Sequence, residues 1–287
     1  MSGGTSAPND PIMSSLRTAA TLGLENLYHY QSFNLDHLRQ VIVDGVIHFS
    51  KPSEFNDPWD CRPWFDFECL GDPKILEQHL QWYIEISRKH RPDIRADVVQ
   101  RTAEEYRRNP DALAAKIREF SHAMAGAIDA QYRVYCLTPK CDSELMWSHY
   151  AAKHQAVCLE FAVRNELFCN ALPVEYAESY PRFQMTGFSG SEEHVAPLLT
   201  KSAAWSYEQE FRLISDEKGD PRHTIVTSGG KKKIPLRSLT AIILGCLTPH
   251  STKQAIREMI AASPHQPLLK TAVRMQNKYQ LMISLQD

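Results

Sequence analysis

Short strand-like apolar runs, interrupted by polar and charged residues, are the pattern that most limits what this chain can fold into. The clearest interruptions are residues 27–30, 55–60, 146–150 and 205–212. A core strand gains nothing from Glu208, Glu210 and Arg212, because burying unpaired charge costs several kcal/mol. Exceptions of this kind concentrate at functional sites. Since these segments lie far apart in sequence, we expect the fold to gather them into a site.

The composition is that of an ordinary globular protein. The chain has 287 residues, of which 43% are hydrophobic and 23% are charged, so one large domain or two small ones are expected. The net charge of −2 gives no bulk attraction to nucleic acid or to an anionic membrane, but it leaves room for a local basic patch.

The cysteines and the hydropathy pattern indicate in which cellular compartment the protein is expected. The seven cysteines are odd in number and form no Cys-x-x-Cys motif, which favours reduced thiols in a cytoplasmic protein. The sequence has no run of about 18 apolar residues, so we expect no transmembrane helix and no membrane partner. The polar N-terminus lacks an apolar signal region, and it predicts a flexible leader.

The residue pattern predicts an α+β fold with a central mixed or antiparallel sheet and flanking helices. Residues 1–25 are expected to form the leader and a short helix over 13–25, and residues 26–287 a single domain. Residues 72–129 show helical spacing and predict a helical insertion. The other expected strands are 27–30, 46–49, 132–137, 156–163, 211–215, 239–245 and two within 268–285; the other expected helices are 35–43, 143–152, 195–204 and 251–262.

Glu208 and Glu210 are the first candidates for chemistry. In an extended segment, residues two apart point to the same face, so the two carboxylates would lie together. Two nearby carboxylates raise one pKa, which suits acid–base work or the stabilisation of a developing cation. The alternative is that Glu210 pairs with Arg212 on an exposed strand face, since charges are mostly surface features.

The remaining candidates each have a structural alternative. His29, between two tyrosines on a strand, could donate to a ligand hydroxyl or phosphate, although a satisfied buried histidine is commoner. Asn56 and Asp57 precede a proline, a pattern that by default builds a turn. The aromatic-rich segment around 147–150 either lines a pocket or anchors a helix. The expected ligand-binding residues are Tyr30, Ser50, Asn56, Asp57, Trp147, His149, Tyr150 and Arg212.

Metal and standard nucleotide motifs are missing from the sequence. The twelve histidines form no His-x-x-x-His or His-Glu-x-x-His pattern, so no metal cofactor is expected. The glycine-rich motifs of dinucleotide and triphosphate folds are missing as well. Three lysines at 231–233 follow two glycines and predict a basic hairpin turn.

Several motifs together resemble an uncharacterised bacterial family catalogued as domain of unknown function 2971. The resemblance runs from about residue 27 to the C-terminus, except for residues 72–129. The motifs that carry it are Leu-Tyr-His-Tyr, Phe-Asn-Asp-Pro-Trp-Asp-Cys, Leu-Met-Trp-Ser-His-Tyr-Ala, Trp-Ser-Tyr-Glu-Gln-Glu-Phe-Arg and Ile-Ile-Leu-Gly. This family implies no activity.

The order of a strand with His, a helix, a strand ending in Ser and a late Glu-x-Glu is also similar to the ADP-ribosyltransferase superfamily. This resemblance implies that His29 contacts the ribose of NAD and that Ser50 supports the nicotinamide side. It further implies that Glu210 stabilises an oxocarbenium-like transition state and that Glu208 orients the acceptor. NAD would then be a substrate, and the fold would be ADP-ribosyltransferase-like.

We therefore expect a bacterial NAD-consuming transferase or glycohydrolase of a toxin or defence system, which acts on a nucleic-acid or protein acceptor. The catalytic residues would be His29, Glu208 and Glu210. Two alternative functions are also consistent with the sequence. One is a non-enzymatic nucleotide- or nucleic-acid-binding module of a defence system, in which Arg62, Arg212 and the lysines at 231–233 contact phosphate. The other is a structural partner protein, in which Glu208, Glu210 and Arg212 form a buried ionic network.

Overall fold

The computed structural model describes residues 17–180, 182–183, 195–219 and 225–286, and these divide into two compact units. Unit 1 comprises residues 1–50, 133–174 and 205–287, and unit 2 comprises residues 51–132 and 175–204. The expected single domain therefore differs from the observed division. The expected leader, residues 1–16, lies outside the described residues.

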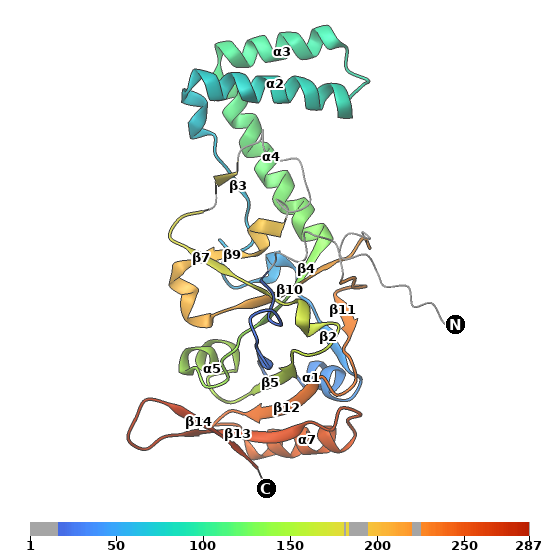
Figure 1. The fold of residues 1–287 in the computed structure, drawn as a ribbon, viewed down its shortest axis with the longest axis vertical. Helices are drawn as coiled ribbons and strands as arrows, with labels where there is room; N and C mark the ends of the chain where they lie inside the picture. The colour runs from blue at the N-terminus through green and yellow to red at the C-terminus, as the bar shows by residue number, and fades with distance from the viewer. Residues whose placement is uncertain (1–16, 181, 184–194, 220–224, 287) are drawn as a thin grey trace, which may run out of the picture. The chain divides into compact units, whose positions relative to one another are not determined.

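Unit 1 is built on a five-stranded mixed sheet (Figure 1), so the predicted mixed sheet with flanking helices is confirmed. Its strand order is β1-β5-β12-β13-β14, with β12 and β13 parallel and the other neighbours antiparallel. The strands are β1 (Asn26–Gln31), β5 (Val157–Ala162), β12 (Leu239–Leu244), β13 (Leu268–Arg274) and β14 (Leu281–Leu285).

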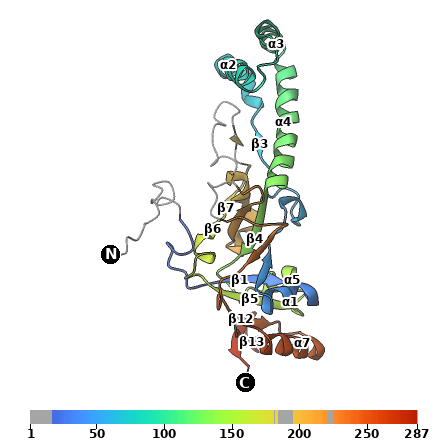
Figure 2. The same ribbon diagram turned by 90° about the vertical axis from the view of Figure 1, so that its right-hand side faces the viewer.

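Both faces of this sheet are covered, which explains why β5 and β12 are nearly continuous apolar runs. On one face, Leu159 and Ile242 share a core with α1 (Leu35–Ile42) and α7 (His250–Ala261). On the other face, Cys158 and Ile243 share a core with Trp147 of α5 (Glu144–Tyr150). Figure 2 shows α1 and α7 from a second direction.

Local signals explain the boundaries of α1. The side chain of Asn34 accepts a hydrogen bond from the N–H of His37, which caps the first turn. The helix ends before Gly45, whose φ of +65° is in the left-handed region. A Cβ at Gly45 would also lie 2.7 Å from Nε2 of His265, so two independent constraints require glycine there.

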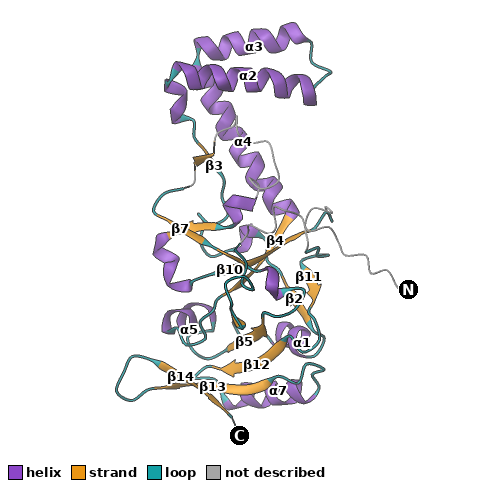
Figure 3. Ribbon diagram, in the orientation of Figure 1, coloured by secondary structure: helices purple, strands orange, loops and turns teal. Residues whose placement is uncertain are grey.

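Unit 1 also contains smaller sheets (Figure 3). The three-stranded sheet has the order β4-β10-β6, formed by β4 (Tyr132–Leu137), β10 (Phe211–Asp216) and β6 (Leu172–Pro173). The basic hairpin strand β11 (Lys231–Lys233) pairs with β2 (Val46–His48). Bridges from Tyr28 to Thr138 and from Ser50 to Val134 join β1 and the end of β2 to the β4 segment.

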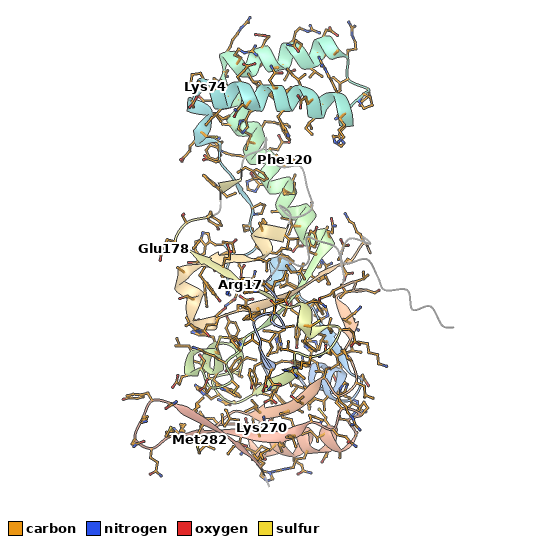
Figure 4. The ribbon with its side chains drawn as sticks, in the orientation of Figure 1. Arg17, Lys74, Phe120, Glu178, Lys270 and Met282 are labelled. Atoms are coloured by element: carbon orange, nitrogen blue, oxygen red, sulfur yellow. The ribbon has the colours of Figure 1, made fainter. Side chains whose placement is uncertain are left out.

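Unit 2 contains the predicted helical insertion, which is confirmed as three helices. They are α2 (Pro73–His90), α3 (Ala96–Arg108) and α4 (Pro110–Gln131), and α2 and α4 begin with proline at a position that lacks a helical N–H partner. Phe120 of α4, labelled in Figure 4, contacts Phe65 edge-on with ring centroids 5.4 Å apart. The short strands β3 (Trp64–Phe65) and β8 (Arg182–Phe183) pair in parallel, as do β7 (Glu175–Ala177) and β9 (Thr200–Ser202).

Two predicted helices are wrong. Within the described part of 13–25, residues 19–23 form a turn, because Thr18 and Thr21 exchange side-chain and main-chain hydrogen bonds and Gly23 has φ +74°. The segment 195–204 forms a 3-10 turn, η5 (Ala196–Leu198), followed by strand β9. Within the described residues, no helix is both long and apolar enough to cross a bilayer.

Candidate functional site

Glu208 is a buried carboxylate that a distant segment of unit 1 holds in place. It is 2% exposed, and its Oε1 accepts a hydrogen bond of 2.6 Å from the hydroxyl of Tyr150 on α5. Its carbonyl oxygen accepts a 2.7 Å bond from Oγ1 of Thr138, and the main chain of Thr138 pairs with Tyr28 of β1. Both ends of this residue are thus fixed by distant parts of unit 1, which is the geometry of a preorganised carboxylate.

Partly exposed aromatic rings gather beside this carboxylate. The ring of His149 lies 6.2 Å from that of Tyr150, 6.5 Å from that of Trp205 and 6.4 Å from that of Tyr207, measured between centroids. The rings of Trp205 and Tyr207 are 6.1 Å apart. We call His149, Tyr150, Trp205 and Tyr207 the aromatic group. Rings arranged in this way can stack on a planar ligand.

The expectation that Glu208 and Glu210 lie on one face of an extended segment is wrong. Glu208 is the last residue of the 3-10 helix η6 (Ala203–Glu208), and Gln209 has φ +47° in the left-handed region. The chain therefore turns between the two glutamates, and the alternation of an extended strand does not apply to them. Glu208 bonds to Tyr150, whereas Glu210 bonds to Arg212.

Glu210 and Arg212 form a buried, bidentate ion pair. Nε of Arg212 donates to one carboxylate oxygen at 2.7 Å and the terminal nitrogen donates to the other at 3.0 Å. The two side chains are 4% and 0% exposed, respectively. The predicted pairing is confirmed, but its placement on an exposed strand face is wrong. Two parallel charge-assisted bonds compensate the desolvation of both ions.

Tyr30 and Trp147 are structural residues of the unit 1 core. Trp147 is fully buried, and its Nε1 donates to the carbonyl oxygen of Cys141 at 2.8 Å. Tyr30 meets Trp147 edge-on at 5.2 Å and donates its hydroxyl to the carbonyl oxygen of Lys140. Their polar atoms are used to satisfy main-chain acceptors.

His29 lies on the other face of β1 from Tyr30, as strand alternation requires. Its Nδ1 donates to the carbonyl oxygen of Cys136 at 2.8 Å, and its ring stacks on Tyr135 at 4.3 Å. Desolvation lowers the pKa of His29 to about 4, so the neutral ring can only accept a hydrogen bond at Nε2. The structure therefore does not bring His29 into the contacts that fix Glu208.

The buried hydroxyl of Tyr135 has no hydrogen-bond partner among the described residues.

We predict that His29 makes the protein acid-sensitive between pH 6.5 and 4. The unfolded chain protonates this histidine near its ordinary pKa of 6.5, whereas the folded ring takes a proton only near 4. The stabilisation is thus fully present above pH 6.5 and is lost as the pH falls through that window, by about 3 kcal/mol. Urea unfolding at several pH values should give a shallower pH dependence for His29→Phe; an unchanged slope would refute this assignment.

Three further predicted ligand residues are Ser50, Asn56 and Asp57. The N–H and C=O of Ser50 both bond to Val134 at 2.9 Å, so its main chain serves the sheet. Asn56 and Asp57 belong to unit 2. Asn56 is exposed, and Asp57 is buried with Oδ1 accepting the N–H of Trp59 at 2.9 Å, which is the turn chemistry expected before proline.

The sequence pattern did not indicate Thr138, Trp205 or Tyr207 as site residues. Thr138 directly follows a predicted strand, but nothing local indicates that its hydroxyl binds a carbonyl 70 residues away. Trp205 and Tyr207 lie in the segment 205–212, which the residue pattern predicts to be extended. In the described part of the chain, no three His, Cys, Asp or Glu side chains are grouped so as to hold a metal ion.

Comparison with known proteins gives no match to a family model, to a curated protein or to a solved structure.

Proposed function

We propose that unit 1 is an NAD-consuming, ADP-ribosyltransferase-like enzyme in which Glu208 supplies the reacting carboxylate. The observation that carries this proposal is the 2.6 Å bond from Tyr150 to Glu208 beside the partly exposed aromatic group. A fixed carboxylate next to stacking rings suits a substrate that is planar and that develops positive charge as it reacts.

The reaction breaks the bond between C1′ of the ribose and the nicotinamide nitrogen. The bonding electron pair goes to that nitrogen, so nicotinamide leaves as a neutral molecule, and positive charge develops at C1′. Glu208 stabilises this charge. A water molecule, or a hydroxyl or amine of an acceptor, then forms a bond to C1′ and releases a proton. The aromatic group would hold the nicotinamide or adenine ring by stacking.

The geometry favours Glu208 over Glu210 as the reacting carboxylate. The superfamily resemblance assigns that role to Glu210, but both of its oxygens accept bonds from Arg212 within the core. A carboxylate whose charge is neutralised by a bidentate guanidinium stabilises a developing positive charge less strongly. Glu210 would then support β10, while Glu208 acts on the substrate.

The proposed setting is a bacterial toxin or defence system in the cytoplasm, with a nucleic acid or a protein as acceptor. A binding module without turnover is the competing function, and the release of nicotinamide from NAD separates the two.

We predict that Glu208→Gln lowers nicotinamide release from NAD by 100-fold or more, on the order of the loss seen when one electrostatic stabiliser of a transition state is removed. The variant keeps the side-chain shape and an acceptor oxygen for Tyr150, so its melting temperature should stay near that of the wild type. Tyr150→Phe should lower release less, because it leaves the charge in place and only loosens its position. Release that survives Glu208→Gln would reject the assignment.

A further inference from the structure

A second candidate site lies in unit 1, away from Glu208. A cavity of about 610 Å³ opens between the first turn of α5, the turn at residues 152–154 and the β13–β14 hairpin. The hairpin loop projects beside α5 in Figure 3, and Figure 4 labels Lys270 and Met282 on its two strands. The lining includes Glu144, His154, Arg274, Lys278 and Tyr279. Glu208 and the aromatic group are not among the lining residues.

The wall at His154 is tightly constrained. Ala152, Lys153 and His154 all have positive φ, at 48°, 55° and 68°, which non-glycine residues rarely adopt in sequence. The N–H of His154 donates to the carbonyl of Trp147, and its own carbonyl accepts the N–H of Leu247. This turn is therefore held in a strained conformation by hydrogen bonds to two other segments, a feature that clusters at ligand sites.

His154 also has an unused polar atom. Its Nδ1 is buried and has no hydrogen-bond partner among the described residues, while the ring stacks parallel to Trp147 at 6.4 Å. Because Nδ1 is shielded from solvent, it belongs to the rigid wall behind the cavity and not to the open surface of the cavity.

The hairpin supplies charge and an aromatic ring. Arg274 and Lys278 are exposed cations that have no ion-pair partner within the described residues, and they outnumber the one acidic side chain of the lining, Glu144. Tyr279 is 104% exposed, so its ring adds nothing to the packing of the fold. Gln276, Asn277 and Gln280 add amide donors and acceptors to the same loop.

From this arrangement we propose that the cavity binds a nucleotide, with its phosphate on Arg274 and Lys278 and its base stacked on Tyr279. A cation that contacts the backbone phosphate together with an aromatic platform is the general means by which proteins hold bases without reading a long sequence. The side-chain amides of Gln276, Asn277 and Gln280 would contact the sugar or the base edge. The same chemistry fits a free nucleotide and one residue of a single strand.

This site is independent of the NAD reaction. It needs neither Glu208 nor turnover, so it holds equally if unit 1 is an enzyme or a binding module. Binding at the hairpin is therefore measured in the full chain and in Glu208→Gln, which removes the proposed reacting carboxylate and leaves the cavity lining unchanged.

The test is equilibrium binding to the full chain by titration calorimetry with AMP, GMP, CMP, UMP and inorganic phosphate, and by anisotropy with a labelled single-stranded thymidine oligonucleotide. Tyr279→Ala and Lys278→Gln are both in exposed positions, and each is expected to weaken binding roughly 5-fold or more. Glu208→Gln, and Lys253→Gln on α7 as the charge-matched control, should leave binding unchanged.

Comparison of the probes distinguishes a free nucleotide from a single strand as the ligand, and three results would overturn the proposal. Tighter binding of the oligonucleotide than of any mononucleotide would identify a single strand as the ligand, and the reverse would identify a free nucleotide. The proposal fails if none of these probes binds, if binding is the same in Tyr279→Ala and Lys278→Gln as in the wild type, or if inorganic phosphate binds as tightly as the nucleotides.

Discussion

Replacing Arg212 by methionine is expected to lower the free energy of unfolding by about 3–5 kcal/mol. Arg212 is fully buried and donates two hydrogen bonds to Glu210. Methionine fills similar space but leaves the carboxylate of Glu210 in the core without its guanidinium. The loss is large because a buried charge must then be either desolvated without compensation or protonated. Urea unfolding followed by circular dichroism measures it.

Two controls decide whether burial is the cause. The double variant Arg212→Met with Glu210→Leu removes both charges and should recover most of the lost stability, since apolar replacement of a complete buried pair is often near neutral. Arg91→Met breaks an exposed pair with Asp93 and should have a much smaller effect. If Arg212→Met proves no more destabilising than Arg91→Met, the pair is not the structural element described above.

Replacing Gly245 by alanine is expected to cost about 3 kcal/mol of stability. An added Cβ would overlap the carbonyl oxygen of His154 and would lie 2.7 Å from its carbonyl carbon and 3.1 Å from Cζ3 of Trp147. The obstacle is main chain in a left-handed turn, and the same carbonyl accepts the N–H of Leu247, so it cannot move cheaply.

The matched control is Gly126→Ala in α4, where an added Cβ meets nothing within 4 Å. There the substitution should stabilise the helix by roughly 0.5–1 kcal/mol, because alanine has the higher helix propensity. Thermal unfolding of both variants gives the comparison. A Gly245→Ala protein as stable as the wild type would show that the turn at 152–154 can adjust, and the rigidity argued for that wall of the cavity would fall.

Local patterns predicted the parts of the fold whose causes are local. Asn34 and Gly45 bracket α1 because a side-chain cap and a left-handed glycine act within a few residues. The extended conformation expected for residues 205–212 is wrong because the residues that hold this segment are distant in sequence. Tyr150 and Thr138 hold Glu208 from 58 and 70 residues away, and a 3-10 turn with these contacts replaces the extended conformation.

The candidate site shows the same limit. Strand alternation already places His29 and Tyr30 on opposite faces of β1, but only the fold shows that His29 stacks on Tyr135 and that Tyr30 meets Trp147. The general preference of charged residues for the surface predicted an exposed face for Glu210 and Arg212. Instead, these two residues of opposite charge form an ion pair inside the core, one just before β10 and the other within it. The residues that join Glu208 to the aromatic group became visible only as contacts between distant segments.

The most direct test of the proposed function is to incubate the purified full chain with NAD and follow free nicotinamide by chromatography, with and without added cell RNA, DNA and protein. The account predicts release by the wild type that is lost in Glu208→Gln and retained, in proportion to the protein that stays folded, in Glu210→Gln. Absence of release under every condition, or release that depends on Glu210 and not on Glu208, would contradict it.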